Sequence, residues 1–130
     1  MRYLSIYKCP ERNTPPTPEE MEAMGKAIEE SKKRGILIST EGCMPTALGA
    51  RVRVDGGKFT VSDGPFTEAK EVVGGLAILE APSKEAAIAY VKEFLGFMGQ
   101  GECELRQIFE APCVEPKGAV VSSELVSAKA

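Results

Sequence analysis

The sequence predicts an α+β domain in which two helices cover one face of an antiparallel sheet. Two segments carry apolar residues at helical spacing, and each begins with residues that favour a helix start. The segments around them are short and rich in β-branched, aliphatic or aromatic residues, which is typical of strands. With 130 residues, 43% hydrophobic and 27% charged, the chain has the composition of one globular domain.

The N-terminal part predicts a strand followed by a helix. Residues 2–8 alternate and contain Tyr, Leu and Ile, as in a strand, and a breaker-rich loop follows. The helix begins at Pro18, because Thr17 is suited to cap it and Glu20 completes a capping box. A basic run before Gly35 ends the helix. We expect its apolar face to pack in the core; this face is Met21, Met24 and Ile28.

The middle of the chain predicts three further strands and one turn. Residues 36–40 form a short apolar strand, and residues 50–54 and 58–61 flank an Asp-Gly-Gly turn, which indicates a hairpin. Residues 72–81 then predict a buried strand. The Gly74-Gly75 pair within it indicates a bulge or a close approach of another backbone.

The C-terminal part predicts a second helix and a last strand. The helix starts after Pro82 and Ser83 and ends at a Gly-Gln-Gly-Glu segment, and its apolar face is Ala87, Ile88, Val91, Leu95 and Met98. Residues 103–111 form the last strand. We therefore expect one domain over residues 1–115. The tail, residues 116–130, is either an additional edge strand or disordered.

This order of elements is that of a ferredoxin-like split β-α-β fold with an inserted hairpin. The helices would cover one sheet face. If Leu4 and Ile6 point to the helices, Tyr3, Ser5 and Tyr7 lie on the other face. Such a partly apolar face needs cover, and a second copy of the sheet is the simplest cover. We expect a homodimer.

Charge and hydropathy exclude several classes of partner. The net charge is −3 with both signs interspersed, so the chain has no electrostatic footprint for nucleic acid. The apolar runs are too short to span a bilayer, and the N-terminal one is too short for a signal peptide. We expect a cytoplasmic protein with neither nucleic-acid nor membrane partners.

The absence of histidine limits the possible chemistry. Triads that depend on imidazole are excluded, and acid–base chemistry must use carboxylates, Lys, Tyr, Cys or an Arg-assisted water. The four cysteines do not form a close pair, so we expect reduced thiols, no metal site and no cofactor. They are Cys9, Cys43, Cys103 and Cys113.

The segment DGPFTEAKE, residues 63–71, places charged residues directly before the buried strand. Its Asp-Gly-Pro start is suited to a turn. The charged residues after it are either a solvated face or part of a cleft. In the second case Asp63 or Glu68 would be a base whose pKa is raised by burial, and Lys70 the electrophilic partner. The candidate ligand-binding residues are Phe66, Glu71, Glu41 and Tyr7.

The ordered motifs EGCMP, ARVRV, DGPFTEAKE, VVGGLAILEA and GECELRQIFE resemble the YCII-related domain family, in its DGPF-motif subgroup. The resemblance covers residues 1–112. It implies a cytoplasmic, dimeric ferredoxin-like α/β barrel with no obligatory cofactor, in a family whose biochemical role is mostly undefined. Some relatives act on small molecules, including the dehydrochlorination of chlorinated aromatic breakdown products. The subgroup motif corresponds to Asp63, Gly64, Pro65, Phe66, Glu68, Lys70 and Glu71.

A His–Asp pair is proposed for catalysis in the wider family, and this chain has no histidine to supply it. Gln100 stands where members often carry one. Two hypotheses follow. The first is a lyase or isomerase that moves a proton next to a carbonyl. The second is a non-catalytic dimeric module that binds a small ligand or a protein partner. An enclosed pocket with converging carboxylates would favour the first.

Overall fold

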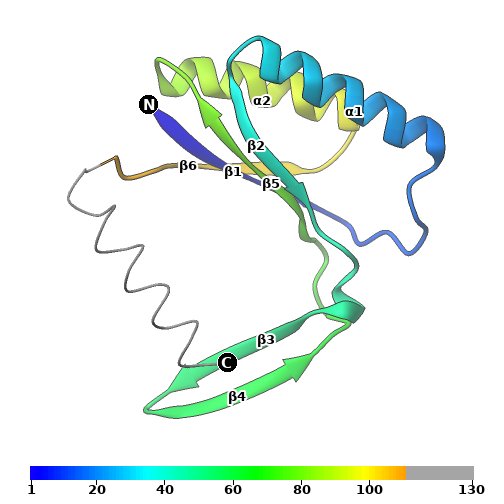
Figure 1. The fold of residues 1–130 in the computed structure, drawn as a ribbon. Coiled ribbons are helices and arrows are strands. Elements are labelled where there is room, and N and C mark those ends of the chain that lie inside the picture. The colour runs from blue at the N-terminus through cyan, green and yellow to red at the C-terminus, as the bar shows by residue number, and fades with distance from the viewer. Residues whose placement is uncertain (111–130) are drawn as a thin grey trace.

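The computed structural model describes residues 1–110, so the predictions for the tail, residues 116–130, lie outside the described residues. The fold is α+β, with two helices and antiparallel sheets, and is compatible with a ferredoxin-like fold (Figure 1). The elements are β1 (Arg2–Cys9), α1 (Pro18–Lys33), β2 (Leu37–Gly42), a 3-10 turn (Thr46–Leu48), β3 (Ala50–Asp55), β4 (Lys58–Asp63), β5 (Val72–Glu80), α2 (Lys84–Met98) and β6 (Glu102–Gln107).

The main sheet has the strand order β2-β5-β1-β6, and every neighbouring pair in it is antiparallel. Both helices lie on one side of this sheet (Figure 1). Among residues 1–110, strands β3 and β4 pair only with each other, and they lie on the side of the sheet away from the helices (Figure 1). The last strand ends at Gln107, earlier than the predicted residue 111.

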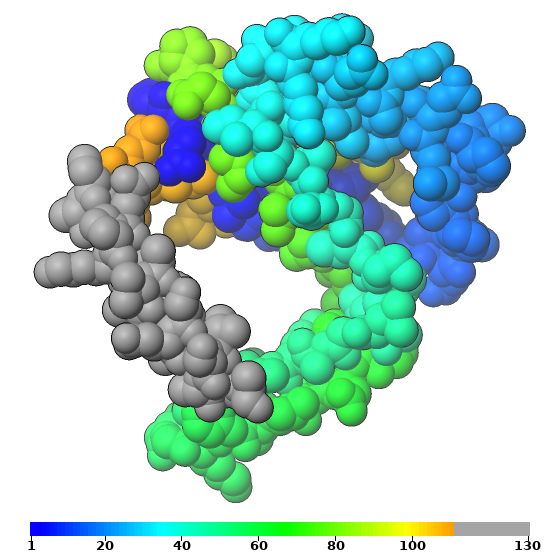
Figure 2. Space-filling model, in the orientation of Figure 1, coloured from blue at the N-terminus to red at the C-terminus, as the bar shows by residue number. Residues whose placement is uncertain are grey.

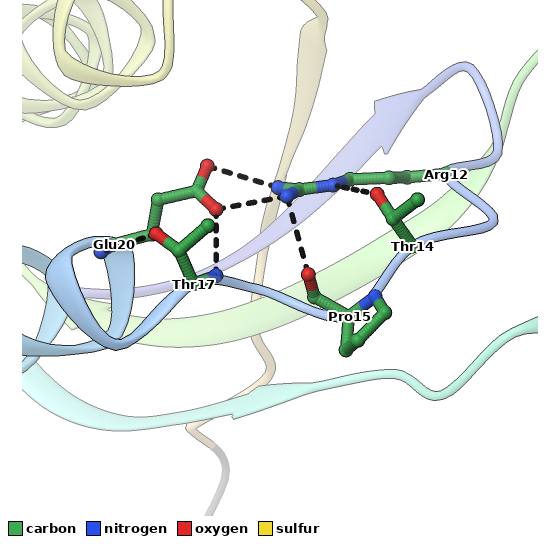
Figure 3. Close-up of polar contacts among 5 residues, drawn as sticks. All are labelled: Arg12, Thr14, Pro15, Thr17 and Glu20. Atoms are coloured by element: carbon green, nitrogen blue, oxygen red, sulfur yellow. Dashed lines mark hydrogen bonds and ion pairs between the residues drawn. The ribbon is translucent and has the colours of Figure 1, made fainter.

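Helix α1 begins as the sequence predicts. The Thr17 hydroxyl accepts a hydrogen bond from the Glu20 backbone N–H at 3.1 Å, and the Glu20 carboxylate accepts one from the Thr17 N–H at 2.8 Å. The Arg12 guanidinium donates to both oxygens of the same carboxylate, at 2.8 and 2.9 Å (Figure 3). It also donates to the Thr14 hydroxyl and the Pro15 carbonyl. One arginine thus fixes the loop that leads into α1.

Helix α2 also has its expected ends. The Ser83 hydroxyl accepts a hydrogen bond from the Ala86 N–H at 3.1 Å, and Gly99 ends the helix at φ 84°, where glycine has no steric cost. Ala87 and Val91 are its buried residues. Within the described residues, neither helix is long and apolar enough to cross a membrane.

The face of β1 that meets the helices is the opposite of the predicted one. Tyr3, Ser5 and Tyr7 are buried on the helix side, and Leu4 and Ile6 lie on the other. The tyrosine rings are long enough to reach the helices, where Tyr3 joins a core with Leu79 and the small Ala81 and Ala87. The prediction assumed that the more apolar side chains would face the helices. The space below the helices is instead filled by the longer tyrosine side chains.

The predicted core face of α1 is confirmed in part: Ile28 packs against the buried core and Met24 is partly buried, whereas the prediction is wrong for Met21, which is 63% exposed. Ser31 is the buried residue of α1. The physical reason is that a cavity separates much of this helix from the sheet, and Met24 and Ile28 line the cavity. The helical spacing identified the inward side of α1, but only part of this side packs against the core.

Candidate functional site

A cavity of about 830 Å³ lies between the helix side of the sheet and the two helices. This volume is within the roughly 300–1,000 Å³ of small-molecule sites. The wall is mostly apolar. Its apolar side chains include Met24, Ile28, Leu79, Val91, Phe94 and Met98, and its polar ones include Ser5, Tyr7, Ser31, Thr40 and Glu41.

The glycine pair in β5 shapes the sheet side of this cavity. The pairing of β1 with β5 shifts register between Tyr7 and Lys8, opposite Gly74. A Cβ added at Gly74 would lie 3.0 Å from the Cys9 sulfur and 3.3 Å from the Tyr7 ring. One added at Gly75 would lie 2.9 Å from a backbone oxygen of β2. The predicted bulge and close approach are therefore both confirmed, and they lie in the cavity wall.

Tyr7 is held firmly in the wall. Its hydroxyl donates to the Gln100 carbonyl oxygen at 2.8 Å, and its ring meets Phe94 edge to face at 5.3 Å between centroids. Burial, as the largest cause, raises the pKa of Tyr7 to about 12, and burial also raises the pKa of the Cys9 thiol. Both groups are neutral near pH 7, so neither is prepared to act as a base there.

A polar cluster joins the two helices beside the cavity. The Tyr90 hydroxyl donates to the buried Ser31 hydroxyl at 2.8 Å. The Arg34 guanidinium donates to both oxygens of Glu93, at 3.0 and 3.2 Å, and lies 5.6 Å from the centre of the Tyr90 ring. These contacts fasten the C-terminal end of α1 to α2 while the rest of α1 stands over the cavity.

The start of the 63–71 segment packs against the 3-10 turn. The Glu11 carboxylate accepts hydrogen bonds from the Thr46 N–H at 2.6 Å and the Thr46 hydroxyl at 2.7 Å. The same hydroxyl accepts one from the Phe66 N–H at 3.1 Å. A Cβ at Gly64 would lie only 1.6 Å from the Thr46 carbonyl oxygen, so this position has room for glycine alone. Three loops meet at this network.

Arg51 holds the part of the segment that follows. Its guanidinium donates to the Glu68 carboxylate at 2.9 Å and lies 3.8 Å from the centre of the Phe66 ring. This hydrogen bond lowers the pKa of the exposed Glu68 carboxyl. A base in a buried cleft would have a raised pKa instead. Glu68 is therefore an ion-pair partner of the β3–β4 hairpin in this geometry.

The structure separates the predicted site residues into two groups. Tyr7 is in the cavity wall. Glu41 borders the cavity, but it is opposite Leu76 in the pairing of β2 with β5, so its exposed side chain lies on the sheet face away from the helices. The five residues from the 63–71 segment lie outside that wall; these are Asp63, Phe66, Glu68, Lys70 and Glu71. Within residues 1–110 neither the Asp63 carboxylate nor the Lys70 ammonium has a side-chain hydrogen bond or ion pair, and the described residues hold no cluster of three metal-ligating side chains.

Sequence reasoning missed Glu11, Thr46 and Phe94. Glu11 and Thr46 are 35 residues apart and carry no local signal that joins them. Phe94 did leave a signal, because it lies three residues after Val91 and four before Met98, on the inward side of α2. The prediction placed only Leu95 in that turn of the helix.

A family model described as YCII-related domain matches residues 1–112, a span that includes every strand and helix described above. No curated protein is significantly similar to this chain.

Proposed function

The chain belongs to the YCII-related domain family, and from the cavity described above we propose that it binds a small, largely apolar molecule between its sheet and its helices. The observation that carries the proposal is the cavity of about 830 Å³, whose wall comes from the sheet and from both helices. Its size and its mostly apolar wall suit a molecule of small-metabolite dimensions.

The polar groups of the wall restrict the ligand further. The Tyr7 hydroxyl is bonded to Gln100, the Tyr90 hydroxyl to Ser31, and the Thr40 hydroxyl to a carbonyl of β5. A polar ligand group placed beside these three hydroxyls would find their donors already used, and an unpaired polar group there costs free energy. An aromatic or alicyclic molecule with one or two polar substituents near the exposed Arg12 and Asn13, which also line the cavity, therefore fits best.

We also propose that the chain is of the DGPF subgroup and works as a homodimer in the cytoplasm. In this arrangement the ferredoxin-like domain, with the β3–β4 hairpin inserted between β2 and β5, pairs as a dimeric α/β barrel. Support comes from the side of the sheet away from the helices, where four apolar residues occupy the centre of β1 and β5. We call this set the open sheet face; it is Leu4, Ile6, Leu76 and Ile78. Contact between copies would bury it.

A pair of alanine variants on α1 tests the ligand proposal. Ala27 is in the cavity wall, whereas Ala23, one turn earlier, is exposed and outside it. Ala27→Phe fills part of the cavity, so we expect it to weaken binding of the dye anilinonaphthalene sulfonate about tenfold or more, measured by fluorescence titration. Ala23→Phe should bind the dye as the wild type does. Equal binding by all three proteins would contradict the proposal.

The second candidate is a lyase or isomerase that uses carboxylate acid–base chemistry. Glu41 lies on the edge strand β2 at the cavity border, with its side chain on the sheet face away from the helices, so its carboxylate would meet only a ligand that extends around this edge. In this alternative, Glu41→Gln abolishes turnover of a substrate found by screening but leaves its binding intact. Asp63, Glu68 and Lys70 would take part only with a ligand that also reaches the protein surface outside the cavity.

A further inference from the structure

The β3–β4 hairpin has an apolar face that no residue among 1–110 covers. The register pairs Val52 with Val61 and Val54 with Phe59, so these four side chains share one face. They are 68%, 64%, 56% and 69% exposed, in that order. We call this set the hairpin apolar face. All residues of both strands are exposed, as if the hairpin stood alone in solvent.

Such a hairpin needs a partner to keep its shape. A two-stranded sheet by itself is marginally stable at best in water. Alternation of apolar and polar residues along both strands is the pattern of a sheet with one solvated and one buried face. The opposite face is suited to solvent, since it carries Arg51, Arg53, Asp55 and Lys58. The sequence is thus that of a covered hairpin.

We propose that the hairpin apolar face binds a second copy of this chain, as an arm that reaches across the homodimer proposed above. The hairpin lies on the same side of the molecule as the open sheet face, and an open space separates the two in Figure 2. Both surfaces are apolar and both belong to one chain. A two-fold axis would bring the arm of each copy against the body of the other, and the contact closes without leaving a free surface.

Two further observations favour a copy of this chain as the occupant. The apolar surface continues at the base of the arm, where Met44 is 72% and Leu48 73% exposed. Arg51, Arg53, Asp55 and Lys58 lie on the opposite face of the hairpin, so contact between the hairpin apolar face and the open sheet face of another copy does not require these charges to be buried.

Photo-crosslinking tests the arm directly. The photoreactive residue p-benzoylphenylalanine replaces Phe59, and as the control it replaces Thr60, which lies on the opposite face of the same strand. The protein is irradiated as a mixture of isotopically light and heavy chains. We expect Phe59 to give a covalent dimer that contains both isotopes, and Thr60 to give little. Cross-links confined to single chains at position 59 would overturn the proposal.

Light scattering separates the arm from the dimer as a whole. We expect a wild-type dimer at micromolar concentration, and a dimer dissociation constant raised about tenfold or more by Phe59→Lys but not by Thr60→Lys. A dimeric wild type whose dissociation constant is unchanged by Phe59→Lys would overturn the arm alone. A monomeric wild type would overturn both the dimer and the arm, while dye binding in the cavity remains a separate measurement. Circular dichroism checks that each variant is folded.

Discussion

Glu68 and Asp63 differ from the candidate bases that the sequence suggested. Glu68 is exposed and paired with Arg51, and such surface pairs contribute little to stability. The Asp63 carboxylate has no hydrogen bond within the described residues, although turn chemistry predicted one. The two carboxylates that suggested a site are thus solvated surface groups beside the β3–β4 hairpin.

We therefore expect Asp63→Ala and Glu68→Gln each to change the free energy of unfolding by less than about 1 kcal/mol. Both variants should also bind the cavity dye as the wild type does. Urea unfolding and the fluorescence titration measure the two quantities. A loss of dye binding with unchanged stability would instead support the interpretation of the 63–71 segment as a site.

Helix α1 begins with a carboxylate whose ionisation affects folding. The Arg12 hydrogen bond, followed by the Thr17 backbone N–H, lowers the pKa of Glu20 to about 2. The unfolded value is about 4.3. Because the folded pKa is depressed, the stabilising effect is complete above pH 4.3 and is lost as the pH falls toward 2.

In melting curves recorded between pH 5 and pH 2, we expect Glu20→Gln to lower the melting temperature at pH 5 and to change it less at pH 2. The wild type should thus lose more stability on acidification than the variant. Glu19→Gln, in the same first turn, is the control. Parallel curves for Glu20→Gln and the wild type would show that the Arg12 pair has no part in stability.

Alanine substitutions at two glycines should have opposite effects on stability, because Gly64 lies in a closely packed loop and Gly25 on the exposed side of a helix. At Gly64 an added Cβ meets the Thr46 carbonyl at 1.6 Å, so Gly64→Ala must displace backbone and should cost at least about 3 kcal/mol. At Gly25 in α1 no described atom lies within 4 Å of an added Cβ, so Gly25→Ala should stabilise by about 0.5–1 kcal/mol. Unfolding in urea measures both, and a mild effect at Gly64 would contradict the close packing of the loop.

At the scale of elements, the sequence predicted what local chemistry determines. The caps at Thr17 and Ser83 and the helix end at Gly99 depend on residues within a few positions, and they were predicted with the helices. The predicted orientation of β1 was wrong. The alternating pattern indicates that Tyr3 and Leu4 point to opposite sides of the sheet, but it does not indicate which side meets the helices. Only the depth of the space under α2 decides that.

At the scale of the whole molecule, the cavity could not be predicted. It lies between the sheet and helices that are joined by the Tyr90–Ser31 hydrogen bond, a contact between residues 59 positions apart. Of the named candidates, Tyr7 lies in its wall and Glu41 at its border, whereas the charged segment at 63–71 does not line it. The charged segment at 63–71 lies at the base of the β3–β4 hairpin instead.

The Gly74-Gly75 bulge has a consequence for selectivity. Both glycines lie in the cavity wall, and even one methyl group there would crowd the Tyr7 ring, the Cys9 sulfur or the backbone of β2. The size of the largest ligand that fits thus depends on the absence of side chains at Gly74 and Gly75 as well as on the side chains that line the cavity. Two members of this family that shared every lining side chain, but differed at these positions, would discriminate between ligands of different thickness.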